Sequence, residues 1–152
     1  MANRGLLLTL TEPPPGMEEE FNAWYDDEHL PERLSIPGFR SARRWILGKT
    51  YLAAYELDSP GVLNSREYLS FFEKPTPWSK RCLGKAVVFK RWACEQVAPG
   101  GAELHPETGA LLLNREFPSC LQVRRFAATS GEKIILAEMK SWQPGAFRAY
   151  GT

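Results

Sequence analysis

The sequence predicts an α+β fold: a ferredoxin-like βαββαβ unit followed by a truncated, degenerate second repeat that lacks its first helix. Three observations support this prediction. Segments typical of strands and helices alternate in that order over roughly the first hundred residues, proline and glycine separate them, and landmarks of the front half recur in the rear half. Both helices then cover one face of the sheet, and the other face needs a second sheet to cover it.

The elements of the front half follow from these breaks. A leucine-rich run stops at Pro13-Pro14-Pro15-Gly16, and two β-prone segments flank the turn at Gly48-Lys49. Proline also interrupts the second helical region at Pro75 and Pro77. In order, we expect a strand at 4–11, a helix at 17–30, strands at 39–47 and 51–57, helices at 65–72 and 78–84, and a strand at 86–97.

The rear half resembles a degraded copy of the front half. Arg43-Arg44-Trp45 matches Arg124-Arg125-Phe126, and Glu56 matches Glu138. We expect strands at 109–117, 121–128 and 133–140, with the chain ending where a second helix would begin.

This organisation predicts three parts: a domain at 1–99, a linker at 100–108, and a partial second repeat at 109–152 that is mostly β and packs on the first. The rear strands could cover the front sheet within one chain or across a dimer. We expect a homodimer, because the rear copy lacks a fourth strand.

The composition excludes several classes of protein. The chain has 152 residues and a net charge of +1, with no basic patch typical of nucleic-acid binding. Three cysteines without close spacing form neither a disulfide framework nor a metal ligand set, so we predict no metal site. The apolar run at the N-terminus is too short for a signal peptide or a membrane span. We therefore expect a cytoplasmic protein without membrane or nucleic-acid partners.

The stretch FNAWYDDEHLPERL, residues 21–34, carries the candidate chemistry. On a helical wheel one face collects an apolar wall followed by a carboxylate and an imidazole: Phe21, Trp24, Tyr25, Glu28 and His29. Asp26 precedes His29 by one turn, and Pro31 is expected to limit the helix.

Such a face suits a pocket for a flat organic ligand. His29 could move a proton near neutral pH, with Glu28 or Asp26 adjusting its pKa. A nearby carboxylate favours the charged imidazole and burial opposes it, and the sequence leaves the balance open. The alternative is that the aromatic residues are ordinary core and His29 is a capping or hydrogen-bonded core residue.

Other side chains could line the same pocket. Arg40 lies on the second strand and could bind a carboxylate or phenolate, although a surface ion pair is the simpler interpretation. The remaining candidates for substrate binding are the aromatic residues Tyr51, Tyr55 and Trp78, which are equally suited to packing.

The run Trp24-Tyr25-x-x-Glu28-His29-x-Pro31, together with YLAAYELDSP and PTPW, resembles the EthD-like branch of the dimeric α+β barrel superfamily. The resemblance implies two ferredoxin-like sheets packed face to face, and a cleft where small aromatic or polyketide-like molecules bind. It also implies that His29 is a cleft residue. Members include cofactor-free cyclases, isomerases, decarboxylases and monooxygenases, as well as accessory proteins without an assigned reaction.

Three functional hypotheses remain. The first is a cofactor-independent enzyme of lyase, isomerase or cyclase type that acts on a small aromatic or polyketide-type compound by proton transfer at His29. The second is a non-catalytic binding protein of a biosynthetic or degradation pathway. The third is a scaffold whose aromatic helix is only core.

Overall fold

The computed structural model describes residues 3–97, 103–116 and 119–151. Its strands form one closed barrel in the order β1-β3-β2-β8-β5-β7-β6-β4, and every neighbouring pair is antiparallel. The strands are β1 (Gly5–Glu12), β2 (Phe39–Leu47), β3 (Thr50–Leu57), β4 (Val87–Val97), β5 (Ala110–Leu113), β6 (Gln122–Ala128), β7 (Lys133–Met139) and β8 (Phe147–Tyr150).

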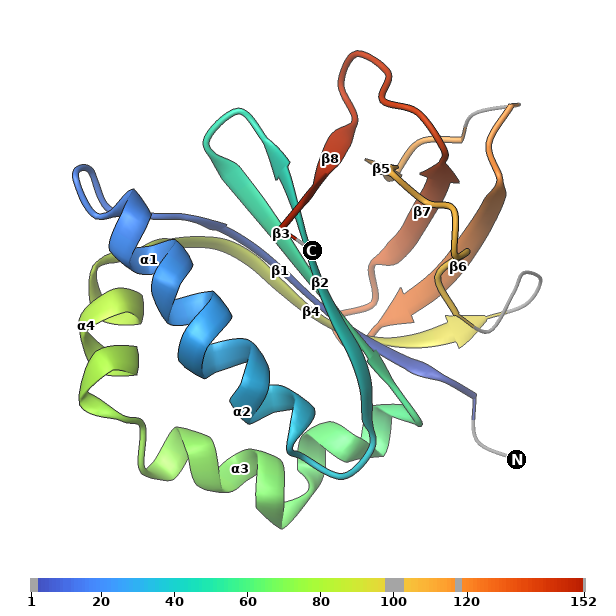
Figure 1. Ribbon diagram of the computed structural model, residues 1–152. Coiled ribbons are helices and arrows are strands. Elements are labelled where there is room, and N and C mark those ends of the chain that lie inside the picture. The colour runs from blue at the N-terminus through green and yellow to red at the C-terminus, as the bar shows by residue number, and fades with distance from the viewer. Residues whose placement is uncertain (1–2, 98–102, 117–118, 152) are drawn as a thin grey trace.

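Helices cover only one side of this barrel. Figure 1 shows them packed along the outside of β1–β4, the front strands, while β5–β8, the rear strands, lie away from the helices. Side-chain caps begin two of the helices, because Ser65 accepts the Tyr68 N–H and Thr76 accepts the Ser79 N–H. The helical segments are α1 (Glu18–Trp24), η1 (Tyr25–His29), α2 (Leu30–Leu34), η2 (Pro60–Asn64), α3 (Arg66–Glu73) and α4 (Pro77–Lys85).

The predicted fold class is wrong. The elements follow the expected order along residues 5–97, and β6 and β7 lie where strands were expected. The sheet, however, is a single closed antiparallel barrel of eight strands within the described residues, rather than an open ferredoxin-like sheet with an incomplete second copy. Phe147–Tyr150, expected to begin a helix, forms β8 instead and joins β2 to β5.

Closure within one chain also removes the reason for expecting a homodimer. The rear strands cover the open face of the front sheet, so the barrel needs no strand from a second copy. The homodimer therefore stays a prediction without that support. The division into 1–99, 100–108 and 109–152 also stays a prediction, and residues 98–102 lie outside the described residues.

The two faces of β3 pack in two separate cores. Leu52 and Ala54 point into the barrel, where they join a cluster containing Trp45 and Phe126. Tyr55 points outward and packs under the helices. Alternation along a strand explains this division, since successive side chains point to opposite faces. The outer core brings the helices and the sheet together and positions the site described below.

One end of the barrel interior holds a buried charge cluster. Arg124 is 1% exposed and pairs with two carboxylates: its Nη2 lies 2.8 Å from Glu56 Oε1, and its Nε donates to Glu138 Oε2. Glu138 also accepts hydrogen bonds from the His105 backbone N–H, the Gln122 side-chain amide and the Thr108 hydroxyl. Each charge in this cluster therefore has a partner, as burial requires.

A candidate ligand cleft between the helices and the sheet

The helix that carries His29 contains a π-helical turn. The Leu30 N–H donates to the Tyr25 carbonyl, five residues earlier, and the turn spans Tyr25–His29. Such turns insert an extra residue into an α-helix and are frequent at functional sites. The helix then continues through Pro31 to Leu34, so the prediction that Pro31 limits the helix is wrong. Proline is tolerated here because it occupies the first turn of α2.

His29 is buried among aromatic rings. Its ring stacks on Trp24 with centroids 4.4 Å apart and meets Tyr25 edge-on at 5.0 Å. Tyr55, from β3, approaches it from the sheet at 6.3 Å. Three elements of the outer core therefore fix the position of the imidazole, which is only 7% exposed.

Burial decides the charge of His29. Burial, together with the positive charges of Arg33 and Arg44, lowers the pKa of the imidazole from 6.5 to about 3, and burial is the largest of these causes. Neither nearby carboxylate counteracts this effect. The ring is therefore neutral at pH 7, which answers the question that the sequence left open.

Two cavities meet at His29. The outer groove, about 400 Å³, runs between α2 and the α3–α4 pair and is lined by His29, Glu32, Arg33, Phe71, Phe72, Pro75, Ser79, Lys80, Leu83 and Gly84. The inner cavity, about 140 Å³, lies over the sheet and is lined by Leu7, Thr9, Thr11, Tyr25, His29, Arg33, Tyr55, Tyr68, Phe72, Leu83, Val88 and Arg91. We call the two together the helix–sheet cleft.

Polar atoms in the inner cavity lack partners. The Tyr55 Oη and Thr9 Oγ1 approach the Tyr25 hydroxyl, yet neither has a hydrogen bond within the part of the chain that the structure describes. Burial raises the pKa of Tyr25 and Tyr55, so both hydroxyls stay protonated at neutral pH. Buried polar groups usually have partners, so these atoms are suited to contacts with a ligand.

The Glu28 carboxylate connects the π-helical turn to α4 by hydrogen bonds. Its Oε2 accepts the Trp24 indole N–H at 3.0 Å and the Thr76 hydroxyl at 2.7 Å, and Ser79 lies 3.2 Å away. Thr76 is also the N-cap of α4, so this carboxylate ties the π-helical turn to the start of that helix. Glu28 thus supports the position of Trp24, on which His29 stacks.

Asp26 lies away from His29. Asp26 was expected beside the imidazole, but it is exposed and lines a different cavity with Arg43, Arg44 and Tyr150. The π-helical turn changes which residues share a helix face, which explains this error.

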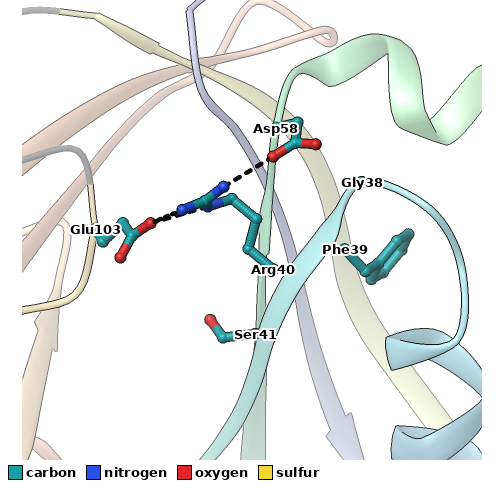
Figure 2. A pocket seen from close by; sticks show the side chains of 6 residues that line it. All are labelled: Gly38, Phe39, Arg40, Ser41, Asp58 and Glu103. Carbon is teal, nitrogen blue, oxygen red and sulfur yellow. Dashed lines mark hydrogen bonds and ion pairs between the residues drawn. The ribbon is translucent and has the colours of Figure 1, made fainter.

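Arg40 is half-exposed and belongs to a surface ion-pair network. Figure 2 shows its guanidinium between Asp58 and Glu103, at 3.1 Å and 2.5 Å. The residues around it form an open pocket of about 430 Å³ at the end of the barrel where β3 ends. The simpler interpretation of Arg40, a surface ion pair, is therefore correct.

The remaining aromatic candidates divide between core and cavity. Phe21 and Trp24 are fully buried core residues, and Trp78 packs against the same cluster from α4. The Tyr51 hydroxyl donates to Glu18 at 2.8 Å, away from both cavities of the cleft. Only Tyr25 and Tyr55 of the predicted aromatic residues line the cleft with His29.

Sequence reasoning missed Arg33 and undervalued Arg44. Arg33 follows His29 by four residues and lines both cavities, which helical spacing would have shown had the helix been extended past Pro31. Arg44 is 2% exposed and lies between the rings of Tyr25 and Tyr51, at 3.9 Å and 4.6 Å. Its Nη2 donates to Asn22 Oδ1, while its Nε and Nη1 are buried without partners among the described residues.

No cluster suited to a metal ion was found in the described ranges, where three or more His, Cys, Asp or Glu side chains would have to converge. The absence of a cofactor remains a prediction. Across the same ranges, every helix is too short or too polar to cross a membrane.

The fold is shared with a solved structure. A crystal structure of a "putative monooxygenase" from Fusobacterium nucleatum superposes with a TM-score of 0.52 and 12% sequence identity, covering 92% of this chain and 77% of that one. No family model matches the chain, and no curated protein matches it. At this level of identity the likeness concerns the fold alone.

Proposed function

We propose that the chain is an enzyme that acts on a small aromatic compound in the helix–sheet cleft, with His29 as the proton-transfer group. One observation carries the proposal: a buried, neutral imidazole lies where the outer groove and the inner cavity meet. A neutral imidazole can accept a proton from a hydroxyl or an acidic C–H group of a bound ligand. The aromatic rings stacked around His29 fix its orientation.

The walls of the cleft support an aromatic ligand. Tyr25, Tyr55, Tyr68 and Phe72 surround the inner cavity, and Phe71 joins them in the outer groove. Aromatic walls favour flat ligands through offset and edge-on ring contacts. The unpartnered hydroxyls of Tyr55 and Thr9 supply the few polar contacts that orient a ligand in an otherwise apolar pocket.

A second function, binding without turnover, is favoured by one observation. General bases are most effective with a pKa near the operating pH, and the pKa of His29 in the free chain is about 3. On this hypothesis the chain is an accessory protein that holds its ligand in the same cleft. The two functions differ in whether any proton transfer depends on His29.

Hydrogen–deuterium exchange tests proton transfer without knowledge of the full reaction. Resorcinol, a small electron-rich phenol, is incubated with the protein in D₂O, and loss of its ring proton signals is followed by NMR. Exchange should be faster with the natural chain than in buffer. His29→Gln keeps hydrogen bonding but cannot shuttle a proton, so it should lower the added rate by about 10²–10⁴.

A matched variant controls for general effects of losing a histidine. The chain has two histidines, and His105 lies on the barrel side, where its backbone N–H donates to Glu138. His105→Gln should exchange at the natural rate. Ligand binding without any exchange above buffer would favour the accessory-protein function. Exchange that is unchanged in His29→Gln would exclude His29 as the proton-transfer group.

Four finer statements stay proposals. The Trp24-Tyr25-x-x-Glu28-His29-x-Pro31 run supports a distant relationship to the EthD-like proteins. The structural neighbour, described as a "putative monooxygenase", suggests oxygenation as the reaction that follows deprotonation, and measurement of dissolved oxygen in the same assay tests it. A cytoplasmic location and a homodimer are also proposed.

A further inference from the structure

Arg33 is a buried cation without a counterion. It is 8% exposed, its Nη1 is fully buried without a partner, and no carboxylate of the described residues lies within the 4.0 Å of an ion pair. Its guanidinium lies over the rings of Tyr68, Phe71 and Phe72, with centroids 5.4–5.8 Å away. Such rings stabilise a cation only partly, and a buried charge normally has a charged partner.

The inner cavity beside Arg33 is positively charged. Its lining includes two arginines, Arg33 and Arg91, and no carboxylate. The Arg91 Nη2 donates to the Tyr68 hydroxyl at 2.8 Å, so Arg91 is partly satisfied while Arg33 is not. Neutral His29 and the protonated Tyr55 hydroxyl can each donate a further hydrogen bond in the same cavity.

The carboxylates nearest to Arg33 in the chain do not neutralise it. Glu28 is engaged by Trp24, Thr76 and Ser79. Glu32 lines the outer groove but forms no ion pair with Arg33. Burial and the charge of Glu28 raise the pKa of this carboxyl, and the smaller opposing effect of Arg33 does not reverse the rise. The positive charge therefore faces the cavity without an internal partner.

From this arrangement we infer that the ligand of the helix–sheet cleft is a small aromatic carboxylate, whose carboxylate pairs with the Arg33 guanidinium. The inference rests on the proposed function, because it places the ligand in the same cleft. The planar guanidinium matches a planar carboxylate, and the tyrosine and phenylalanine walls match the attached ring. Arg33 thus sets the charge specificity of a site in which His29 performs the chemistry.

Matched pairs of acids and amides test this inference. Benzoate and salicylate carry the charge, whereas benzamide and salicylamide have nearly the same shape without it. In titration calorimetry each acid should bind the natural chain at least about tenfold more tightly than its amide, since a charged hydrogen-bonded pair contributes more than a neutral one. Arg33→Gln should abolish this preference, because it should weaken the binding of the acids much more than that of the amides.

Two further variants control for the loss of charge and for the loss of an arginine elsewhere on the surface. Arg33→Lys keeps the charge but loses the planar fork, so it should keep part of the preference for acids. Arg81→Gln removes an exposed arginine that pairs with Glu20 on the outside of α4, and it should keep the full preference. Circular dichroism confirms that each variant is folded.

The outcomes separate the inference from the proposed function. If the amides bind as tightly as the acids, the inference is wrong and the aromatic site stands. If Arg33→Gln weakens acids and amides alike, Arg33 does not select the charge and the inference is wrong. If no aromatic compound binds at millimolar concentration, both the inference and the proposed function are wrong.

Discussion

Two buried arginines lie on opposite faces of the front strands. Arg124 lies inside the barrel and pairs with Glu56 and Glu138, while Arg33 lies in the helix–sheet cleft beside aromatic rings and forms no ion pair within the described residues. Both are more than nine-tenths buried. The difference indicates that the charges at the barrel end are already paired within the chain, whereas the cleft keeps a positive charge available for a ligand.

The landmarks that recur between the two halves of the sequence make this contrast sharper. Arg124 corresponds in sequence to Arg43, and Glu138 corresponds to Glu56. Arg124 bridges both glutamates, while Arg43 is exposed and lies over the Trp45 ring. The next positions also differ: Arg125 is exposed and pairs with Glu116, whereas Arg44 is buried beneath the first helix and has no carboxylate partner within the described ranges. The helices present only in the front half create this buried positive charge.

Loss of the paired arginine should have the largest effect on stability. Arg124→Ala leaves two carboxylates buried without their cation, which typically costs about 3–5 kcal/mol of unfolding free energy. Urea denaturation measures the change. Arg125→Ala removes an exposed ion pair and should cost less than about 1 kcal/mol. A cost below 1 kcal/mol for Arg124→Ala would show that the buried cluster is not structural.

The second largest expected effect is a loss of stability at low pH that depends on His29. Its pKa is about 3 in the folded chain and 6.5 as a reference for the unfolded chain, so the unfolded state binds the proton first as pH falls. The contribution of the neutral ring is complete above pH 6.5 and declines toward pH 3. Between pH 7.5 and pH 5 the natural chain should lose about 2 kcal/mol more than His29→Gln. Parallel pH profiles would disprove the neutral, buried imidazole.

Loss of the unpaired arginine should change stability much less. Arg33→Met keeps an apolar stem against Phe71 and Phe72 and removes a charge that has no partner. The lost cation–π contacts and the relieved charge burial have opposite signs, so the unfolding free energy should change by less than about 1 kcal/mol. A loss comparable to that of Arg124→Ala would mean that Arg33 is a structural residue and would remove the contrast between the two regions.

The smallest expected effect is a change in the pKa of His29 when the charge of Arg33 is removed. Arg33 is a secondary cause of the low pKa of His29, after burial. Arg33→Met should therefore raise the pKa of His29, followed by NMR of the imidazole protons, while the ring stays far from its ordinary value. Arg81→Met, on the outside of α4, should leave it unchanged. A downward shift in Arg33→Met would contradict the described position of the guanidinium.

The order of elements could be read from the sequence because it depends on local signals. Proline and glycine breaks placed β1 to β4 and the intervening helices, and the wheel placed Phe21, Trp24, Tyr25 and His29 on the buried face. The closing strand could not be read in this way. Phe147–Tyr150 is four residues long, and its pairing partners, β2 and β5, are distant in sequence.

The sequence by itself determined which residues form the aromatic face around His29 and where most strands lie, because side-chain periodicity and turn residues act over a few neighbours. Only the tertiary structure decided that the sheet closes within one chain, that the helix continues past Pro31, and that His29 is neutral. These properties depend on burial and on charges brought together across the fold. Arg33 and Arg44 affect His29 through space, and their missing counterions are visible only once the surroundings are packed.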